Sequence, residues 1–397
     1  MCFLRWLIVG LIMLSYSVSR AEQPEFISLL ESYRNCFESF ILNNKQEAFS
    51  CFEAGLRSNP TNWPVLYNSA VILVEQGKFE AAYERFLKVY ELKPDFPAAR
   101  LGMAFCKAKL GDFEKSIDIL QRANKWGEKK LDAQYNKALA YAELKKFQEA
   151  LESFEQALKI QRDHFFSLLG KGLTLLKLGM TSQAREVCLA AEAFWPEYPE
   201  VLKCLGLAEA KMGNHANAQA YFDSAFSVEP SATNLVNLLV HLLKRNEREK
   251  ILALLDKHKG LLRTAESNYK AALILISVGD LSNSIPYLVA ASDKDLSESH
   301  LVLGKVLKDL SDELQSKKYY EKYLKNRPHC KGDIADSSKT SAFISKAQTK
   351  PAYTQKNGCG IIPLDYDVNW SLPFSTNWLR ENDSYGLDVF DNEPVRP

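Results

Sequence analysis

A repeat of 34 residues constrains this chain more than any other feature of its sequence. Between residues 166 and 230, two copies of one pattern follow each other directly. Small, bulky and proline positions recur at this spacing: Gly172 and Gly206, Ala184 and Ala218, Cys188 and Phe222, Ala191 and Ala225, Pro196 and Pro230. A fixed period of roughly 20 to 50 residues indicates a fold built from stacked repeats.

The same columns continue toward the N-terminus. One small-residue column runs through Gly206, Gly172, Ala138, Ala104, Ala70 and Cys36, and a second through Ala218, Ala184, Ala150, Ser116, Ala82 and Ala48. The bulky column holds Phe222, Cys188, Phe154, Leu120, Phe86 and Phe52, and proline recurs at Pro94 and Pro60. Columns of such constant size over six units indicate one structural unit that is repeated along the chain.

Each unit reads as two antiparallel helices joined by a tight turn. The first helix needs a small residue where the second crosses it, and the second supplies alanine there with a bulky residue one turn later. Gly77, Gly111, Gly179 and Gly213 are expected in the turns, because glycine adopts the backbone angles that end a helix. Proline at the end of a unit stops the second helix.

This pattern resembles the tetratricopeptide repeat, a helix–turn–helix unit of the same length. The segments LLGKGLTLLKLGMTSQAREVCLAAEAFWP and LKCLGLAEAKMGNHANAQAYFDSAFSVEP carry its signature of small, aromatic and proline positions. The resemblance covers roughly residues 29–328 and is strong from Trp63 to Pro230. It implies an all-α, right-handed superhelical solenoid that acts by binding other proteins.

The solenoid is expected to span residues 22–328 with about nine repeats, degenerate at 22–62 and 231–260. In LVNLLVHLLKRNEREKILALLDKH the small crossing residues are missing, although the segment is amphipathic and helical in pattern. Register returns at Ala272 and Gly279, and a last unit ends at Pro328. This shift of the repeat register predicts an irregular unit at 231–260 within a stack that continues on both sides.

The first 21 residues have the layout of a secretory signal peptide. Arg5 precedes an apolar run from Trp6 to Tyr16, and small residues follow up to Ala21. Cleavage after Ser19 or Ala21 would send a secreted or periplasmic protein into an oxidising compartment. An uncleaved anchor is the alternative, since Arg20 adjoins the cleavage site.

Seven of the eight cysteines remain after such a cleavage. Cys36 and Cys51 lie on facing helices of the first hairpin, where they form either a disulfide or two small core positions. Cys330 and Cys359 are the second candidate pair. Cys188 stands in the bulky column and is interpreted as plain core, although Cys204 lies on the next helix. The spacing of the cysteines fits no metal site.

Residues 329–397 depart from the repeat pattern. A closing helix is expected at 334–348, and the segment 358–397 is acidic, aromatic and broken by proline and glycine. Its aromatic residues are Tyr366, Trp370, Phe374 and Trp378. One hypothesis is that this segment occupies the chain's own binding surface as a tethered ligand. The alternatives are a cap on the last repeats, a part of the partner's site, or an enzyme or glycan-handling factor whose chemistry lies in this segment, with sugar or metal binding through Asp365, Asp367, Trp370 and Trp378.

Composition and motifs do not favour an enzyme. The formal net charge of +1 and the absence of a basic stripe argue against nucleic acid and anionic lipid as partners. The six histidines are scattered, and no nucleophile, phosphate-binding or metal motif is present in the sequence, so no cofactor is expected. The first interpretation is therefore a non-catalytic scaffold or assembly factor, which touches membranes only through its partner.

A peptide or protein partner is expected on the first helix of each hairpin, one turn either side of the small crossing residue. The candidate binding residues are Tyr67, Val71, Leu101, Phe105, Tyr135, Leu139, Phe166, Leu169, Leu173, Lys203 and Tyr269, with Lys305 further on. Tyrosine is the best candidate because it joins an apolar ring to a polar tip. The leucines have an alternative interpretation as core between repeats.

Overall fold

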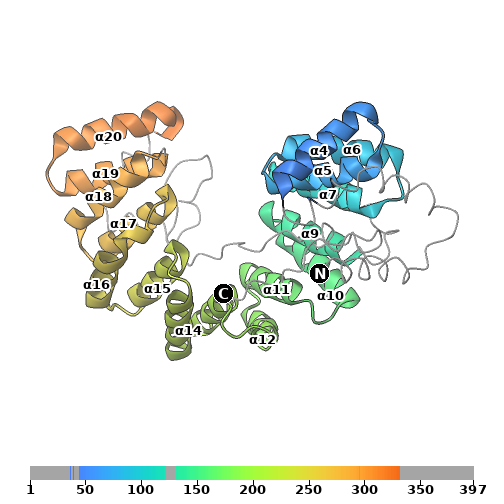
Figure 1. Cartoon of the computed structure of the whole chain (residues 1–397). Helices are drawn as coiled ribbons and strands as arrows, with labels where there is room; N and C mark the ends of the chain where they lie inside the picture. The colour runs from blue at the N-terminus through green and yellow to red at the C-terminus, as the bar shows by residue number, and fades with distance from the viewer. Residues whose placement is uncertain (1–35, 37–38, 40–43, 122–129, 295, 331–397) are drawn as a thin grey trace. The chain divides into compact units, whose positions relative to one another are not determined.

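The computed structural model describes residues 36, 39, 44–121, 130–294 and 296–330 (Figure 1). The signal sequence, the expected closing helix and the segment 358–397 lie outside these residues. The described residues form α-helices and two short 3₁₀ helices, without a strand among them. None of the described helices has the length and apolar character needed to cross a membrane.

The described chain divides into two compact units, and the boundary falls within α11, after Thr174. Unit 1 holds α4 (Lys45–Ser58), α5 (Trp63–Glu75), α6 (Phe79–Leu92), α7 (Pro97–Lys109), α8 (Phe113–Gln121), α9 (Lys130–Glu143), α10 (Phe147–Ile160) and most of α11 (Phe165–Lys177). Unit 2 begins at Leu175 and holds α12 (Thr181–Glu192), α13 (Pro199–Lys211), α14 (His215–Val228), α15 (Ala232–Lys244), α16 (Arg248–His258), η3 (Lys259–Leu261), α17 (Ala265–Ser277), α18 (Leu281–Ser292), α19 (Ser297–Asp309), α20 (Glu313–Asn326) and η4 (Pro328–Cys330).

Within each unit, helices that follow each other along the chain pack as antiparallel hairpins. The pairs are α5 with α6, α7 with α8, α9 with α10, α13 with α14, α15 with α16, α17 with α18, and α19 with α20. We call the odd-numbered first helices from α5 to α19 the A helices and the even-numbered second helices the B helices. This arrangement is the stack of helix–turn–helix units that the repeat period predicts.

The turns inside the hairpins confirm the expected role of glycine. Gly77, Gly111, Gly179 and Gly213 all have φ between 72° and 83°, in the left-handed region. Three hairpins use another residue at the equivalent place: Lys145, Asn246 and Ser311, with φ of 58° to 65°. The left-handed turn is thus kept even where glycine is replaced, at a modest cost in backbone strain.

These turn residues also explain why the sequence register slips after residue 230. Gly213, Asn246, Gly279 and Ser311 follow one another at steps of 33, 33 and 32 residues. The hairpin of α15 and α16 is therefore intact but one residue shorter than the preceding units. A search at a constant step of 34 loses its columns, whereas the packing of the helices continues.

The bulky residues of the B helices pack against glycines of the A helices. A Cβ placed on Gly206 would lie 2.9 Å from Phe222 of its own hairpin, and one on Gly304 would lie 2.7 Å from Tyr320. Gly102 and Gly170 meet bulky residues of the preceding hairpin, Phe86 and Phe154, at 2.7 and 2.4 Å. Each of these rings therefore packs directly against the backbone at a glycine, and a larger residue in place of the glycine would prevent this contact.

Two disulfides lie within the described residues. Cys36 and Cys51 are bonded with a Cα–Cα distance of 5.3 Å, which confirms the first candidate pair. Cys188 and Cys204 are also bonded, at 6.3 Å, so the interpretation of Cys188 as plain core is wrong. The bulky column of α12 faces α13 of the next hairpin closely enough for a covalent bond. Cys330 is disulfide-bonded too, with a partner outside the described residues, and its pairing with Cys359 stays a prediction.

Candidate partner-binding face

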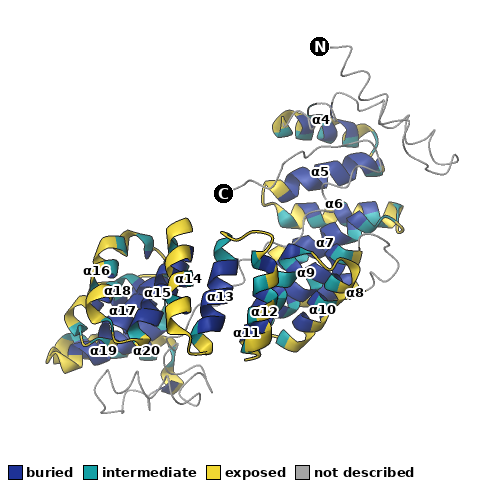
Figure 2. Ribbon diagram, turned by 90° about the horizontal axis from the view of Figure 1, so that it is seen from below, coloured by how far each residue is buried: buried dark blue, intermediate teal, exposed yellow. Residues whose placement is uncertain are grey.

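The A helices and B helices differ sharply in burial. Eleven consecutive residues of α5, Pro64–Val74, are buried, whereas α6 buries only Ala82, Phe86 and Val89. The same contrast separates α13 from α14, and Figure 2 shows α13 mostly in dark blue beside the largely yellow α14. The A helices are therefore the inner layer of each unit, as expected for the helices that carry the candidate residues.

The candidate residues occupy equivalent places on successive A helices. Tyr67, Leu101, Tyr135, Leu169, Lys203 and Tyr269 form one row, and Val71, Phe105, Leu139 and Leu173 form a second row one turn later. All of these side chains are buried, with at most 5% of their surface exposed. Phe166, near the start of α11, is the one candidate that is partly exposed. Their role in binding a partner stays a prediction.

The tyrosines of the first row are buried among neighbouring rings. The ring of Tyr67 lies edge-on to Phe86 and Phe96, with centroids 5.6 and 5.1 Å away. Burial raises the pKa of Tyr67, so it stays neutral. Tyrosine at this position fills the space between an A helix and its flanking segments, which the sequence pattern does not distinguish from a surface role.

A second aromatic cluster surrounds Phe166 in unit 1. The rings of Tyr135 and His164 are 5.3 Å apart, and Phe166 lies 6.4 Å from each. His164 Nδ1 is 2.7 Å from the hydroxyl of Ser167, at the start of α11. Burial lowers the pKa of His164, although Asp163 opposes this, so a neutral ring packs beside Phe166. Phe166 is thus a partly exposed aromatic side chain with two neighbouring rings packed near it.

In unit 2, a buried acidic group ties three segments together. Glu209 on α13 is 1% exposed. Its carboxylate accepts hydrogen bonds from Arg185 Nε at 2.6 Å and from Asn214 Nδ2 at 2.7 Å. Burial by itself would raise the pKa of Glu209, but these hydrogen bonds hold it below its usual value. The network joins α12, α13 and the turn before α14, so we assign it to stability.

Lysines also lie in the buried layer of unit 2. Lys203 on α13, Lys270 on α17 and Lys305 on α19 have 2%, 7% and 3% of their surface exposed. Lys270 pairs with Glu266 at 2.7 Å, one turn earlier on the same helix. The A helices of unit 2 thus combine apolar residues with buried charges of both signs, since Glu209 and Glu298 are buried on them too, whereas the candidate residues of unit 1 are apolar or aromatic.

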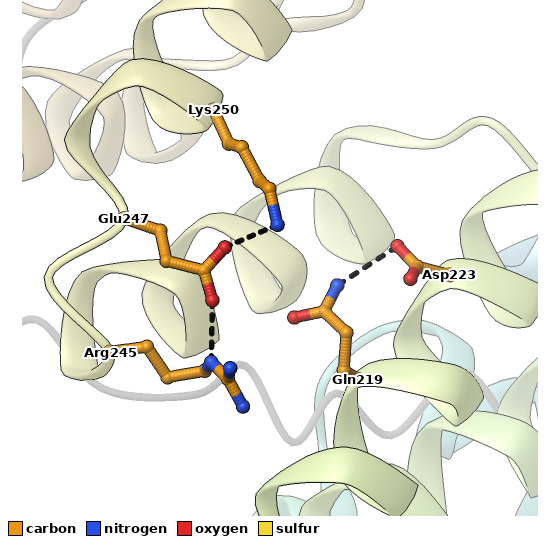
Figure 3. Close-up of polar contacts among 5 residues, drawn as sticks. All are labelled: Gln219, Asp223, Arg245, Glu247 and Lys250. Atoms are coloured by element: carbon orange, nitrogen blue, oxygen red, sulfur yellow. Dashed lines mark hydrogen bonds and ion pairs between the residues drawn. The ribbon is translucent and has the colours of Figure 1, made fainter.

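The turn between α15 and α16 carries a network at the surface of unit 2 (Figure 3). Glu247 accepts from Arg245 Nε and pairs with Lys250 Nζ, both at 2.5 Å, and Gln219 donates to Asp223 on α14 nearby. The hydrogen bond from Lys250, followed by that from Arg245, holds the pKa of Glu247 below its usual value. The carboxylate therefore links residues on both sides of Asn246, the left-handed residue of this turn.

Two further features of the described residues are a pocket in unit 1 and a buried serine–histidine contact in unit 2. A pocket of about 280 Å³ in unit 1 is lined by Lys137, Tyr141, Glu149, Glu152, Ser153, Glu155 and Gln156, none of them a candidate residue. Ser292 and His300 are 2.7 Å apart, but both are more than nine-tenths buried and join α18 to α19. Within the described ranges no three His, Cys, Asp or Glu side chains are placed to hold a metal ion.

Comparisons with known proteins agree with the repeat pattern. Family models described as tetratricopeptide repeat match residues 73–140, 131–164 and 297–330. A solved tetratricopeptide repeat protein from Parabacteroides merdae superposes with a TM-score of 0.53 at 16% identity, covering 62% of this chain and 97% of that one. At this identity the likeness shows the fold alone, a stack of helical hairpins.

Two curated proteins from Bos taurus are similar over shorter segments. BBSome complex member BBS4 is 27% identical over 167 residues, which is 42% of this chain and 32% of that protein. DnaJ homolog subfamily C member 3 is 31% identical over 116 residues, 28% of this chain and 23% of that protein. The matches thus span a third or less of the length of these relatives.

Proposed function

Because this chain is a tetratricopeptide repeat protein, we propose that it is a non-catalytic scaffold or adaptor that binds a protein or peptide partner on its A helices. Tetratricopeptide repeats act in protein–protein interaction, and each repeat adds one A helix to a continuous surface. The observation that carries the proposal is the partly exposed aromatic side chain of Phe166 on the A helix α11, since the other candidate side chains are buried.

Within unit 1 we propose that contact centres on Phe166. This side chain is partly exposed and is supported by Tyr135 and His164. Aromatic residues held in place by neighbouring rings make strong anchors, because little side-chain entropy is lost on binding. An apolar side chain of the partner, such as leucine or phenylalanine, fits this support.

We propose that the protein works in a secretory or periplasmic compartment. The signal layout of the first 21 residues motivates this proposal, and the disulfides Cys36–Cys51 and Cys188–Cys204 support it. Structural disulfides persist mainly in oxidising compartments. N-terminal sequencing of native material should find a chain that starts at Arg20 or Glu22. A native chain that keeps Met1 and has every thiol reduced would contradict the proposal.

The relatives support a role in assemblies. The name of the bovine relative BBSome complex member BBS4 places that protein in a multi-protein complex. Since the likeness covers 32% of that protein, we carry over a role in a complex and no particular partner. The alternative of sugar or metal binding through the segment 358–397 lies outside the described residues.

The experiment compares two phenylalanine variants in the full chain. Phe166→Asp alters the partly exposed aromatic residue on α11, and Phe194→Asp alters a residue that is 46% exposed beyond the end of the B helix α12. Proteins cross-linked to each variant in native material are identified and quantified by mass spectrometry, with circular dichroism as the folding control. Partners that cross-link to Phe194→Asp but not to Phe166→Asp would support binding on the A helices. If both variants lose the same partners, or both keep them, the proposed binding at Phe166 is wrong.

A further inference from the structure

The A helices of unit 2 are buried around their whole circumference. Every residue is buried in four runs: 201–209 on α13, 234–242 on α15, 267–276 on α17 and 298–307 on α19. Nine residues make two and a half turns at 3.6 residues per turn, so every direction around each helix is sampled. In unit 1, α5 has a run of the same kind at 64–74, whereas α9 has partly exposed side chains at Lys137 and Tyr141.

The hairpin stack explains burial on some sides of these helices. Among the described elements, α17 packs extensively against α15 and α18, and α19 packs against α18 and α20. In a stack of hairpins the B helices form one layer and the A helices the other. The side of the A helices that faces away from the B layer is left for another segment to cover.

Whatever covers this side must suit both apolar and cationic groups. Lys203, Lys270 and Lys305 are buried on these helices, together with Tyr269 and Leu301. A buried ammonium group is stable only beside an anionic or strongly polar acceptor. An acidic segment with apolar residues between its carboxylates has the required composition.

The chain itself contains such a segment beyond the described residues. Residues 359–369, CGIIPLDYDVN, place Asp365 and Asp367 among aliphatic residues. From Asp365 to the C-terminus the chain has seven acidic residues and only two arginines. Pro363 favours an extended backbone before it, which suits a strand-like segment lying across helices.

The position of Cys330 brings this segment within reach. Cys330 lies in the core cluster of α19 and α20 and is disulfide-bonded. Cys2 and Cys359 are the two cysteines outside the described residues, and Cys2 belongs to the expected signal. A bond to Cys359 would place its Cα within about 7 Å of that of Cys330. Six further residues then reach up to about 20 Å, which is two helix spacings of about 8–10 Å.

We propose that residues 359–369 lie along the A helices of unit 2, with Asp365 and Asp367 directed toward Lys305 and Lys270. In an extended chain these two carboxylates point the same way about 7 Å apart, so they can meet lysines of neighbouring A helices. The segment is then a tethered ligand that an external partner must displace. This inference goes beyond the proposed function and does not depend on which external partner binds.

Zero-length cross-linking of the full mature chain tests the proposal. A carbodiimide joins a carboxylate to an amine that touches it, and peptide mapping then locates the bond. We expect bonds from Asp365 or Asp367 to Lys305, Lys270 or Lys203. They should disappear in the double variant Asp365→Asn, Asp367→Asn, whereas the Lys171–Glu155 pair of unit 1, 2.9 Å apart, should still cross-link as the internal control.

Two further measurements distinguish the other occupants of this face. In an equal mixture of ¹⁵N-labelled and unlabelled protein, cross-links of mixed isotope mass would show that a second copy supplies the segment and would overturn the proposal. Hydrogen exchange of the amides of residues 361–369 should be at least tenfold slower than in the free peptide of the same sequence. Exchange at the rate of the free peptide, without cross-links to the three lysines, would also overturn it.

Discussion

Substitution of Gly170 by alanine tests the packing between consecutive hairpins. A Cβ at this position of α11 would lie 2.4 Å from Cζ and 2.5 Å from Cε1 of Phe154 on α10. Carbon atoms prefer separations of about 3.5–4.0 Å, so the ring must move by roughly 1 Å. Phe154 is fully buried and its ring also lies against Tyr135, with centroids 6.0 Å apart, which restricts that movement.

Two opposing effects set the size of the change. Overpacking of a well-filled core costs about 1–3 kcal/mol, and clashes with two ring atoms place this site in the upper part of that range. Alanine gains about 1 kcal/mol over glycine in a helix interior. We therefore expect Gly170→Ala to lower the free energy of unfolding by about 1–2 kcal/mol. Gly206→Ala, whose shortest contact is 2.9 Å, should cost less.

Urea unfolding followed by circular dichroism measures this change, with hydrogen exchange of α10 and α11 to localise it. Gly260→Ala is the matched control, because a Cβ there meets nothing within 4 Å. Phe154→Leu should be less costly in the Gly170→Ala background than alone, with a coupling of about 1 kcal/mol. If Gly170→Ala is as stable as the native chain, or if the coupling is zero, the assigned contact is wrong.

Three further outcomes are expected from the described residues. Arg185→Ala should lower the midpoint of urea unfolding above pH 4.5, where Glu209 is ionised. The difference from the native chain should shrink as the pH falls through the lowered pKa of Glu209, because a protonated carboxyl has no ion pair to lose. An equal difference at all pH values would exclude the ion pair. The double variant Cys188→Ser, Cys204→Ser should lose about 2–4 kcal/mol of stability in urea unfolding, as is usual for loss of a native disulfide. Cys106 should resist alkylation at pH 8 in the folded chain and react only after unfolding, since burial raises its pKa to about 12; rapid native labelling seen by peptide mapping would contradict this.

The period of the sequence predicted the class of fold and the place of most helices. Small and bulky columns 34 residues apart identify helical hairpins because the crossing of two helices tolerates only certain sizes at fixed positions. The turns at Gly77, Gly111, Gly179 and Gly213 were also predictable, because few residues other than glycine adopt a left-handed backbone at low cost. Lys145 and Ser311 were not predictable as turn residues, because packing of the flanking helices imposes their conformation.

The sequence predicted which helices carry the candidate residues, but it did not predict that their side chains are buried. The sequence by itself determined that Tyr67, Lys203 and the equivalent residues lie on the A helices, because helical periodicity is local. Only the tertiary structure decided that these side chains are buried. It likewise decided that Cys188 bonds to Cys204 and that Gly170 meets the ring of Phe154. These contacts join residues of different helices, and the distance between two helices depends on every side chain packed between them, which no single repeat encodes.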